Sequence, residues 1–290
     1  MVKIKKVIFP VGGLGTRFLP ATKSLPKEML PVFNKPLIQH AFEEARSAGI
    51  EQFIFITGRN KNAINNHFDH AYELQHVLNQ KDKKNELKET SEWLPDAGNV
   101  AFIRQQKPLG LGHAIWCARN YVKDEAFAVI LADELLKIKD KNCLKDMINL
   151  YEEDNSKNIV GVYEVDKDKT NNYGIIDFKD NDKSLLVKDM IEKPSVDKAP
   201  SNLAIIGRYI LQPEIFSILE KQEKGAGDEI QLTDAMRSLN NGDNFLAHKF
   251  TGQRFDCGSP MGFLEANLSY ALDEDKEKVT KIIKKYSDED

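Results

Sequence analysis

The sequence predicts an α/β fold with a mostly parallel sheet, and two observations carry this prediction. In the first half of the chain, short apolar runs alternate with segments whose apolar residues recur every three or four positions, which is typical of strands alternating with helices. In the second half, several apolar runs follow one another without long helical segments between them, which indicates an antiparallel or mixed portion beside the first sheet.

The first half supplies the alternating elements. Residues 7–9 form an apolar run that ends in a glycine-rich turn, and they predict a buried strand. Pro36 opens a helix with one apolar face, and Gly49 ends it. The same patterns predict the following further elements: strands at 53–56, 100–103 and 127–131, and helices at 60–68, 71–87 and 112–122. In such a fold, ligands bind at the carboxyl ends of the parallel strands.

The second half is less regular. Its apolar runs predict strands at 159–165, 174–178, 185–190 and 203–211, and helical periodicity returns at 214–219, 230–239 and 261–272. The tail at 273–290 is rich in both charges, which indicates a solvated helix or a docking arm. Because we find no internal repeat and no Ser/Gly-rich linker, we expect one domain over residues 1–290.

Composition narrows the class of protein. The chain has 290 residues and a net charge of −4, which argues against a protein that binds nucleic acid through a basic surface. No stretch approaches the roughly 20 apolar residues that span a bilayer, and the N-terminal apolar run is too short for a signal peptide. Three cysteines without a paired spacing favour a reducing compartment, so we expect a cytoplasmic protein that does not bind a membrane.

The sharpest feature is the run Gly12-Gly13-Leu14-Gly15-Thr16-Arg17, directly after the first strand. Glycines let backbone N–H groups wrap an anion without obstruction by Cβ, and Arg17 adds a permanently charged fork for phosphate oxygens. Lys27 lies ten residues later between Pro26 and Pro31, where it could be a second fixed cation. These residues predict a phosphate site; the alternative is that the glycines form only a tight turn.

Two familiar phosphate motifs do not fit. The chain lacks the GxxxxGK[ST] pattern of a Walker A loop. The dinucleotide fingerprint GxGxxG fails because Phe18 stands where its third glycine belongs, which counts against an NAD-dependent enzyme.

With these residues the chain resembles a known family, the bacterial UTP–glucose-1-phosphate uridylyltransferases. The Gly12–Arg17 loop alone marks the wider sugar nucleotidyltransferase superfamily. The resemblance runs nearly the whole chain, and three segments narrow it to the uridylyltransferases: Lys27-Glu28-Met29-Leu30-Pro31, Ala199-Pro200-Ser201-Asn202-Leu203-Ala204 and Gly227-Asp228-Glu229-Ile230-Gln231-Leu232-Thr233-Asp234. One departure is Ala132, where many relatives are expected to have proline.

The resemblance implies a Rossmann-like, three-layer nucleotidyltransferase fold with a mostly parallel mixed sheet and an added antiparallel sugar-binding region. The nucleotide-binding part would cover about residues 1–135, the sugar-binding part about 136–260 and a C-terminal helical arm about 261–290. It implies that the enzyme joins UTP to α-D-glucose 1-phosphate, giving UDP-glucose and pyrophosphate. It also implies Mg²⁺ dependence and a homodimer or homotetramer.

In that reaction the attacking oxygen is already anionic, so catalysis needs positioning and charge neutralisation rather than a protein nucleophile. Arg17 would stabilise the leaving pyrophosphate, and Lys27 would lie near the α- or β-phosphate. Lys193 would hold the sugar phosphate, although its spacing alone fits a surface charge equally well. Asp133 ends an apolar strand and is the best first metal ligand, and Asp256 is the best second. The alternative for both carboxylates is that they cap a following helix.

The remaining expected contacts concern the base and the sugar. Gln105 and the backbone of Gly112 could read the uracil edge, because an amide offers both a donor and an acceptor. Backbone groups of the loop could act likewise, and the resemblance adds Glu28; the nucleotide-binding set is Val11, Gly12, Gly13, Gly15, Thr16, Glu28, Gln105 and Gly112. Gly174 and Glu192 would contact glucose hydroxyls.

His113 lies early in a predicted helix, without the Ser, Cys or Asp partner of a catalytic histidine, and we expect it to be structural or to support the ligand-contacting residues. Two alternative functions stay open. One is a thymidylyltransferase acting on glucose 1-phosphate, and the other is a non-catalytic sugar-nucleotide sensor; loss of Arg17, Lys27 or Asp133 would signal a sensor, and all three are present.

Overall fold

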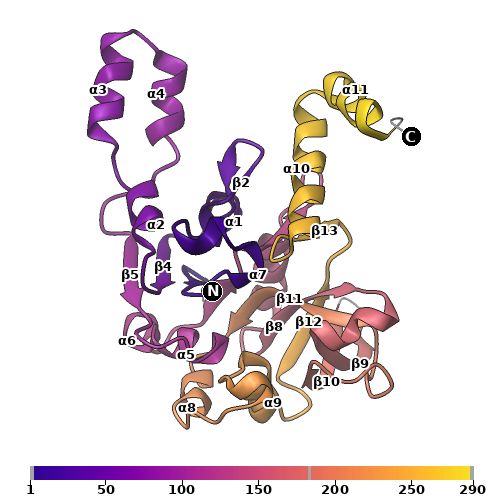
Figure 1. Ribbon diagram of the computed structural model, residues 1–290. Coiled ribbons are helices and arrows are strands. Elements are labelled where there is room, and N and C mark those ends of the chain that lie inside the picture. Colours follow the sequence, from indigo (N-terminus) through magenta and orange to yellow (C-terminus); the bar gives the residue numbers. More distant parts are fainter. Residues whose placement is uncertain (1–2, 182–183, 288–290) are drawn as a thin grey trace.

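The computed structural model describes residues 3–181 and 184–287, and it contains a mixed nine-stranded sheet between two layers of helices (Figure 1). The order of the strands is β5-β4-β1-β6-β11-β8-β12-β10-β9. Their bounds are β1 Lys6–Val11, β4 Gln52–Thr57, β5 Val100–Arg104, β6 Phe127–Ile130, β8 Asn158–Glu164, β9 Gly174–Asn181, β10 Ser184–Glu192, β11 Leu203–Leu211 and β12 Phe245–Lys249.

The first four strands in this order are parallel, as the alternating pattern predicts. From β11 onwards the pairs are antiparallel except for β8 with β12. The mixed part is therefore continuous with the parallel part, because β11 pairs directly with β6. Two short ribbons complete the strands: β2 Pro31–Val32 with β3 Lys35–Pro36, and β7 Glu134–Lys137 with β13 Gln253–Asp256.

The helices cover both faces of the sheet, because successive residues of a buried strand point to opposite sides. In β1, Phe9 packs into a core with α1 and α7, whereas Ile8 packs into a second core with α5, α8 and α9. The helices are α1 Leu37–Ser47, α2 Asn62–His67, α3 Tyr72–Gln80, α4 Lys84–Ser91, α5 Leu111–Trp116, α6 Arg119–Val122, α7 Cys143–Glu153, α8 Ile215–Leu219, α9 Leu232–Leu239, α10 Pro260–Glu274 and α11 Lys276–Ser287. The α/β class and the mixed sheet are thus confirmed, but the sheet is not mostly parallel: among the described residues, four of its neighbouring strand pairs are parallel and four are antiparallel.

Several predicted elements differ from those observed. The single helix predicted at 71–87 is wrong: the chain forms a hairpin of α3 and α4, separated at Asp82, whose φ of 52° is incompatible with a continuous helix. The helix predicted at 112–122 is also divided, into α5 and α6. The sequence patterns did not predict α7 or the strands β2, β3, β7, β12 and β13. In the tail, α11 confirms a helix as far as Ser287, and residues 288–290 lie outside the described part.

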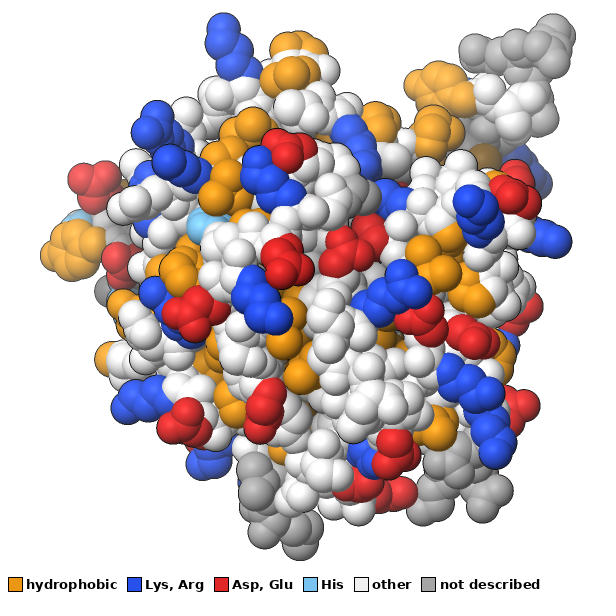
Figure 2. All heavy atoms as spheres, turned by 90° about the horizontal axis from the view of Figure 1, so that it is seen from below, with side chains coloured by type: hydrophobic (Ala, Val, Ile, Leu, Met, Phe, Trp, Pro, Cys, Tyr) orange, Lys and Arg blue, Asp and Glu red, His pale blue; other side chains and the backbone are white. Residues whose placement is uncertain are grey.

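Two arms stand away from the sheet in Figure 1, the α3–α4 hairpin and the α10–α11 pair. Figure 2 views the molecule from below, and among the residues coloured there, basic and acidic side chains are interspersed over this face. Such a mixed surface differs from the basic patch that binds a nucleic acid backbone. None of the helices in the described part of the chain is long and apolar enough to cross a membrane.

Candidate active site

The glycine-rich loop leaves the carboxyl end of β1 and packs against the segment that carries Lys27. Gly15 has a φ of 68°, and a Cβ there would lie 3.2 Å from Lys27 Cβ and 3.3 Å from Thr22 Cγ2. Thr22 Oγ1 also donates a hydrogen bond to the Gly15 carbonyl at 2.7 Å. Glycine is therefore required at this position, both for the backbone conformation and for the close contact. Val11 ends β1, and Thr16 begins the 3₁₀ turn η1 (Thr16–Phe18) that carries Arg17.

Three predicted residues from distant parts of the chain meet beside Gly258. A Cβ at Gly258 would lie 2.9 Å from Asp256 Oδ1 and 3.3 Å from both Asp133 Oδ2 and Arg17 Nη1. The Arg17 guanidinium also donates to the Gly258 carbonyl at 3.4 Å. The structure thus brings two carboxylates and one guanidinium around a single point that is open because residue 258 has no side chain.

Neither carboxylate caps a helix. Asp133 is followed by the strand β7. Asp256 precedes α10, but the cap of that helix is Ser259, whose hydroxyl accepts a hydrogen bond from the Gly262 amide at 3.2 Å. Asp256 Oδ1 instead accepts from the amide of Gly258 at 3.0 Å. The alternative that the sequence left open, helix capping, therefore does not account for these two acidic residues.

Lys27 joins the same cluster through Asp133. The Lys27 ammonium lies 2.5 Å from Asp133 Oδ2, with the two side chains 22% and 27% exposed. Burial by itself would lower the pKa of Lys27, but the charges of Asp133 and Glu28 outweigh it, so the pKa is raised. Burial would likewise raise the pKa of Asp133, but the charge and hydrogen bond of Lys27 outweigh it and lower the pKa. Both groups are therefore charged at neutral pH.

A second ion pair, which no sequence pattern predicted, joins Arg254 of β13 to Glu134 of β7 next to this cluster. Arg254 donates to both oxygens of Glu134, at 2.7 and 2.6 Å, and the two side chains are only 7% and 13% exposed. The Arg254 guanidinium also lies 4.7 Å from the centre of the Tyr173 ring. Burial raises the pKa of Glu134 to about 7, although Arg254 opposes this shift. Because Glu134 pairs with Asp256 across β7 and β13, this network fixes the strands that carry both acidic residues.

Gln105 lies at the same edge of the sheet, directly after β5. Its backbone N–H donates to the Thr57 carbonyl at 2.8 Å, which continues the pairing of β5 with β4. Its side-chain Oε1 lies 2.8 Å from the point that a Cβ of Gly12 would occupy. The absence of a side chain at Gly12 therefore leaves room for the Gln105 amide beside the loop.

Two other residues of the expected nucleotide set are already engaged within the protein. The amide of Gly112 donates to the Ile230 carbonyl at 2.8 Å, and a Cβ on Gly112 would lie 2.8 Å from the same oxygen. The backbone N–H of Gly112 is thus engaged within the protein, and the missing side chain permits close packing against Ile230, while the expected contact of the Gly112 backbone with uracil stays a prediction. The Glu28 side chain is 2% exposed and pairs with Lys61 at 2.7 Å, while its Oε1 has no hydrogen-bond partner among the described residues.

The predicted sugar residues form a separate group. Gly174 and Glu192 face each other across β9 and β10. A Cβ at Gly174 would lie 3.0 Å from Thr233 Oγ1 and 3.2 Å from Glu192 Oε2, so Thr233 of α9 belongs to this group although we did not single it out from the sequence. Lys193 follows with a φ of 46°, and its half-exposed ammonium lies 3.5 Å from Glu192 Oε1. The spacing of residues in the sequence could not predict that α9 packs beside the β9–β10 hairpin.

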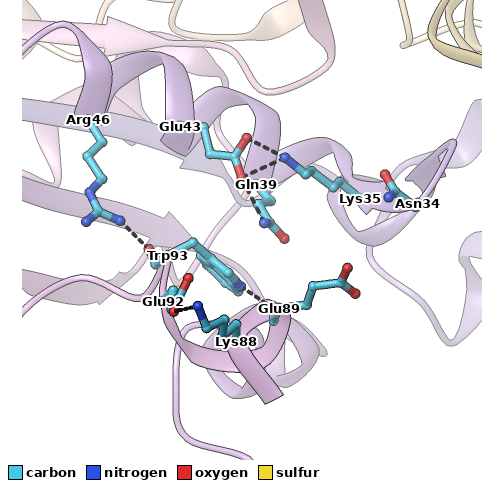
Figure 3. A pocket seen from close by; sticks show the side chains of 9 residues that line it. All are labelled: Asn34, Lys35, Gln39, Glu43, Arg46, Lys88, Glu89, Glu92 and Trp93. Carbon is cyan, nitrogen blue, oxygen red and sulfur yellow. Dashed lines mark hydrogen bonds and ion pairs between the residues drawn. The ribbon is translucent and has the colours of Figure 1, made fainter. Parts of the chain in front are cut away.

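A cavity of about 450 Å³ lies elsewhere, between α1 and the Lys84–Trp93 region (Figure 3). Its positive charges already have acceptors: Lys35 contacts Glu43 at 2.9 Å, and Lys88 contacts Glu92 at 3.6 Å. The Arg46 guanidinium donates to the Trp93 carbonyl at 2.9 Å. The described residues that line it include none of the predicted site residues. A cavity whose cations are already paired is poorly suited to polyanionic substrates.

Comparisons with known proteins show the family to which the chain belongs. The nucleotidyl transferase family matches residues 5–272. The UTP–glucose-1-phosphate uridylyltransferase 1 of Staphylococcus saprophyticus is 46% identical over 286 residues, covering 98% of this chain and 99% of the relative. The UTP–glucose-1-phosphate uridylyltransferase of Bacillus subtilis is 48% identical over 278 residues, covering 96% and 94%.

Solved structures of UDP-glucose pyrophosphorylases are also similar to this chain. UTP-bound UGPase from Acinetobacter baumannii superposes with a TM-score of 0.89 at 41% identity, covering 97% of this chain and 98% of that one. A UDP-glucose pyrophosphorylase in complex with UDP-glucose gives a TM-score of 0.82 at 42% identity, covering 92% and 98%. A putative glucose-1-phosphate thymidylyltransferase from Bacillus anthracis is 20% identical with a TM-score of 0.68 and shares the fold.

Proposed function

This chain belongs to the nucleotidyl transferase family, and we propose that it transfers the uridylyl group of UTP to α-D-glucose 1-phosphate. The observation that carries this function is the convergence of Arg17, Lys27, Asp133 and Asp256 beside a glycine-rich loop, with Gln105 at the same sheet edge. Its relatives at 46% and 48% identity over nearly the whole chain bear the name of the same activity.

The reaction needs no protein base. A phosphate oxygen of glucose 1-phosphate, already anionic, attacks the α-phosphorus of UTP. The new P–O bond forms as the bond from the α-phosphorus to the oxygen bridging to the β-phosphate breaks, and pyrophosphate leaves with the electron pair. Because charge builds up on phosphate oxygens, fixed cations should supply most of the catalysis. Arg17 and Lys27 are the cations held at the loop, and we assign Lys193 to the sugar phosphate.

We further propose Mg²⁺ as the cofactor, held by Asp133 and Asp256. The donor set fits this ion, since Mg²⁺ prefers one or two carboxylates together with substrate phosphates. Both carboxylates have an oxygen within 3.3 Å of the same point beside Gly258. When bound there, the ion would offset part of the repulsion between the two polyanionic substrates. The protein supplies the placement of the two acidic side chains, which the Glu134–Arg254 pair makes rigid.

The glucose ring is assigned to the group around Gly174. The carboxylate of Glu192 can accept hydrogen bonds from sugar hydroxyls. Gly174 allows close approach, and Thr233 Oγ1 adds a second polar atom at the same place. Arg254 connects this region to the carboxylates, since it contacts Glu134 on one side and the Tyr173 ring, one residue before Gly174, on the other.

We also propose that the chain forms a homodimer or a homotetramer. Apolar side chains are exposed along the C-terminal arm, including Met261 at 74% and Tyr286 at 69%. An arm of this kind gains apolar burial when it packs against a second copy. Sedimentation equilibrium should give the mass of a dimer or tetramer, and a monomer at micromolar concentration would contradict the proposal.

A pyrophosphate-release assay tests the function. The chain is mixed with Mg²⁺, one nucleoside triphosphate (UTP, dTTP or CTP) and one sugar 1-phosphate from a panel. We expect the highest kcat/KM for UTP with glucose 1-phosphate. Preference for dTTP would support the thymidylyltransferase alternative, and UTP binding without pyrophosphate release would support a sensor.

A further inference from the structure

The orientation of the Gln105 amide is fixed by its neighbours, and this orientation determines what the site offers to a base. Gln105 Nε2 lies 3.1 Å from the Gly110 carbonyl oxygen and 2.9 Å from His113 Nδ1. A carbonyl oxygen can only accept a hydrogen bond, so the amide atom beside it must be the NH₂ group. That assignment does not depend on the protonation state of His113.

The tautomer of His113 follows from the same contacts. An NH₂ group has two hydrogens, and the Gly110 carbonyl uses one of them. The other points to His113 Nδ1, which must therefore be the unprotonated, accepting nitrogen of a neutral ring. Burial, and then the charge of Arg119, lower the pKa of His113, which keeps the ring neutral. Cys117 Sγ lies 3.9 Å from the same nitrogen and is a weak partner.

The oxygen of the Gln105 amide remains for a ligand. None of the described residues donates a hydrogen bond to Oε1, which lies beside Gly12 at the loop that receives the nucleotide. A lone oxygen can accept a hydrogen bond but cannot donate one. Uracil carries a hydrogen on N3, whereas the N3 of cytosine is an acceptor, so the two bases present opposite partners to this oxygen.

We propose that His113 is a positioning residue for nucleotide specificity: by accepting from Gln105 Nε2, it holds Oε1 toward the base, where it selects the N3–H of uracil over cytosine. The inference rests on the proposed function in that it places the base of UTP at Gln105. Without the His113 acceptor, the amide keeps one hydrogen bond, to the Gly110 carbonyl, instead of two. Turning over to present its NH₂ group to the N3 of cytosine then sacrifices one hydrogen bond rather than two, so a larger share of the protein adopts that orientation.

Two substitutions at one position separate this role from simple packing. His113→Leu fills the space of the ring with an apolar side chain and removes the acceptor, whereas His113→Asn places an amide oxygen at the position of Nδ1 and can restore it. His67→Leu is the matched control. This substitution also removes a His–Gln contact, the one of 3.1 Å between His67 Nε2 on α2 and Gln39 Oε1 on α1, but it involves neither Gln105 nor the loop.

The measurement is kcat and KM for UTP and for CTP in the full-length protein. In His113→Leu we expect the KM for UTP to rise about 3- to 10-fold, the effect of one hydrogen bond. The ratio of kcat/KM for UTP over CTP should fall about tenfold or more, because the site no longer rejects the wrong edge. His113→Asn should recover most of this ratio, and His67→Leu should leave it unchanged.

Binding without the second substrate distinguishes this inference from the function itself. Calorimetry with UTP or CTP alone should show the same loss of discrimination in His113→Leu, and ¹⁵N NMR should show an unprotonated Nδ1 on His113. Equal discrimination in His113→Leu and the wild type, or a protonated Nδ1, would overturn the inference even if UTP is turned over normally. A wild type that binds UTP selectively but releases no pyrophosphate would contradict the proposed function alone.

Discussion

Replacing Gly258 by alanine tests whether the point between the two carboxylates and Arg17 is where the chemistry occurs. The new methyl group would lie 2.9 Å from Asp256 Oδ1 and 3.3 Å from both Asp133 Oδ2 and Arg17 Nη1. These distances are shorter than ordinary van der Waals contact, so each side chain must move by a few tenths of an ångström. The methyl group also fills space that a phosphate oxygen or a metal ion would need.

The expected cost falls on catalysis rather than on folding. Misplacing reacting groups by about 1 Å can cost about 100-fold in rate, so shifts of a few tenths of an ångström, together with the lost space, should lower kcat of Gly258→Ala by about 10- to 100-fold. Gly258 is not among the residues with positive φ, so alanine can adopt its backbone conformation. The unfolded chain loses some freedom in return, and the free energy of unfolding should change by no more than about 1 kcal/mol.

Cys257→Ala provides the matched contrast at the neighbouring position. The Cys257 side chain is fully buried in the small core beneath α10, and its truncation should cost about 1–2 kcal/mol of stability. It leaves the space beside Gly258 open, so kcat should stay within about threefold of the wild type. Pyrophosphate release and urea denaturation of both variants check the pair of outcomes. A Gly258→Ala variant with normal kcat would refute the assignment of the site.

Three further predictions follow from the same cluster. Asp133→Asn should lose most activity at ordinary Mg²⁺ and regain part of it at high Mg²⁺, because the amide keeps the size but not the charge; activity that survives chelation of the metal would contradict this. Arg17→Ala and Lys27→Ala should each lower kcat by about 100-fold or more with unchanged circular dichroism, and near-normal turnover in both would remove the phosphate-loop assignment. Arg254→Met should lower the free energy of unfolding by about 3–5 kcal/mol, since it leaves the buried Glu134 unpaired, and a chemical melt that matches the wild type would show that the pair contributes little.

The parallel half of the fold could be predicted because its signals are local. A short apolar run such as 53–56 is bounded by turn residues, and the period of its neighbours distinguishes strand from helix. The division of α3 from α4 could not be predicted, because it leaves no local signal in the sequence. Both halves have helical composition, and only the positive φ at Asp82 divides them, a conformation that no sequence period reveals.

The site residues likewise fall into those that the sequence could predict and those that it could not. Arg17, Lys27 and Asp133 are flanked by glycines, prolines or an apolar strand, so their setting can be read from nearby residues. Arg254 and Thr233 have no such setting. Their roles depend on the pairing of β7 with β13 and on α9 packing near Gly174, contacts between segments far apart in the chain. Only the three-dimensional structure supplies those contacts.

The pairing of Lys27 with Asp133 has a consequence for how the site binds its ligands. With the ammonium 2.5 Å from Asp133 Oδ2, the carboxylate already has a cation, and a metal ion would have to compete with it. A triphosphate offers Lys27 other oxygens, and contact with them would free the Asp133 oxygen for Mg²⁺. We therefore expect carboxylates and phosphates to hold the ion jointly, which is the ligand set that Mg²⁺ prefers. In this arrangement the same lysine stabilises the acidic cluster before the nucleotide arrives and neutralises phosphate charge afterwards.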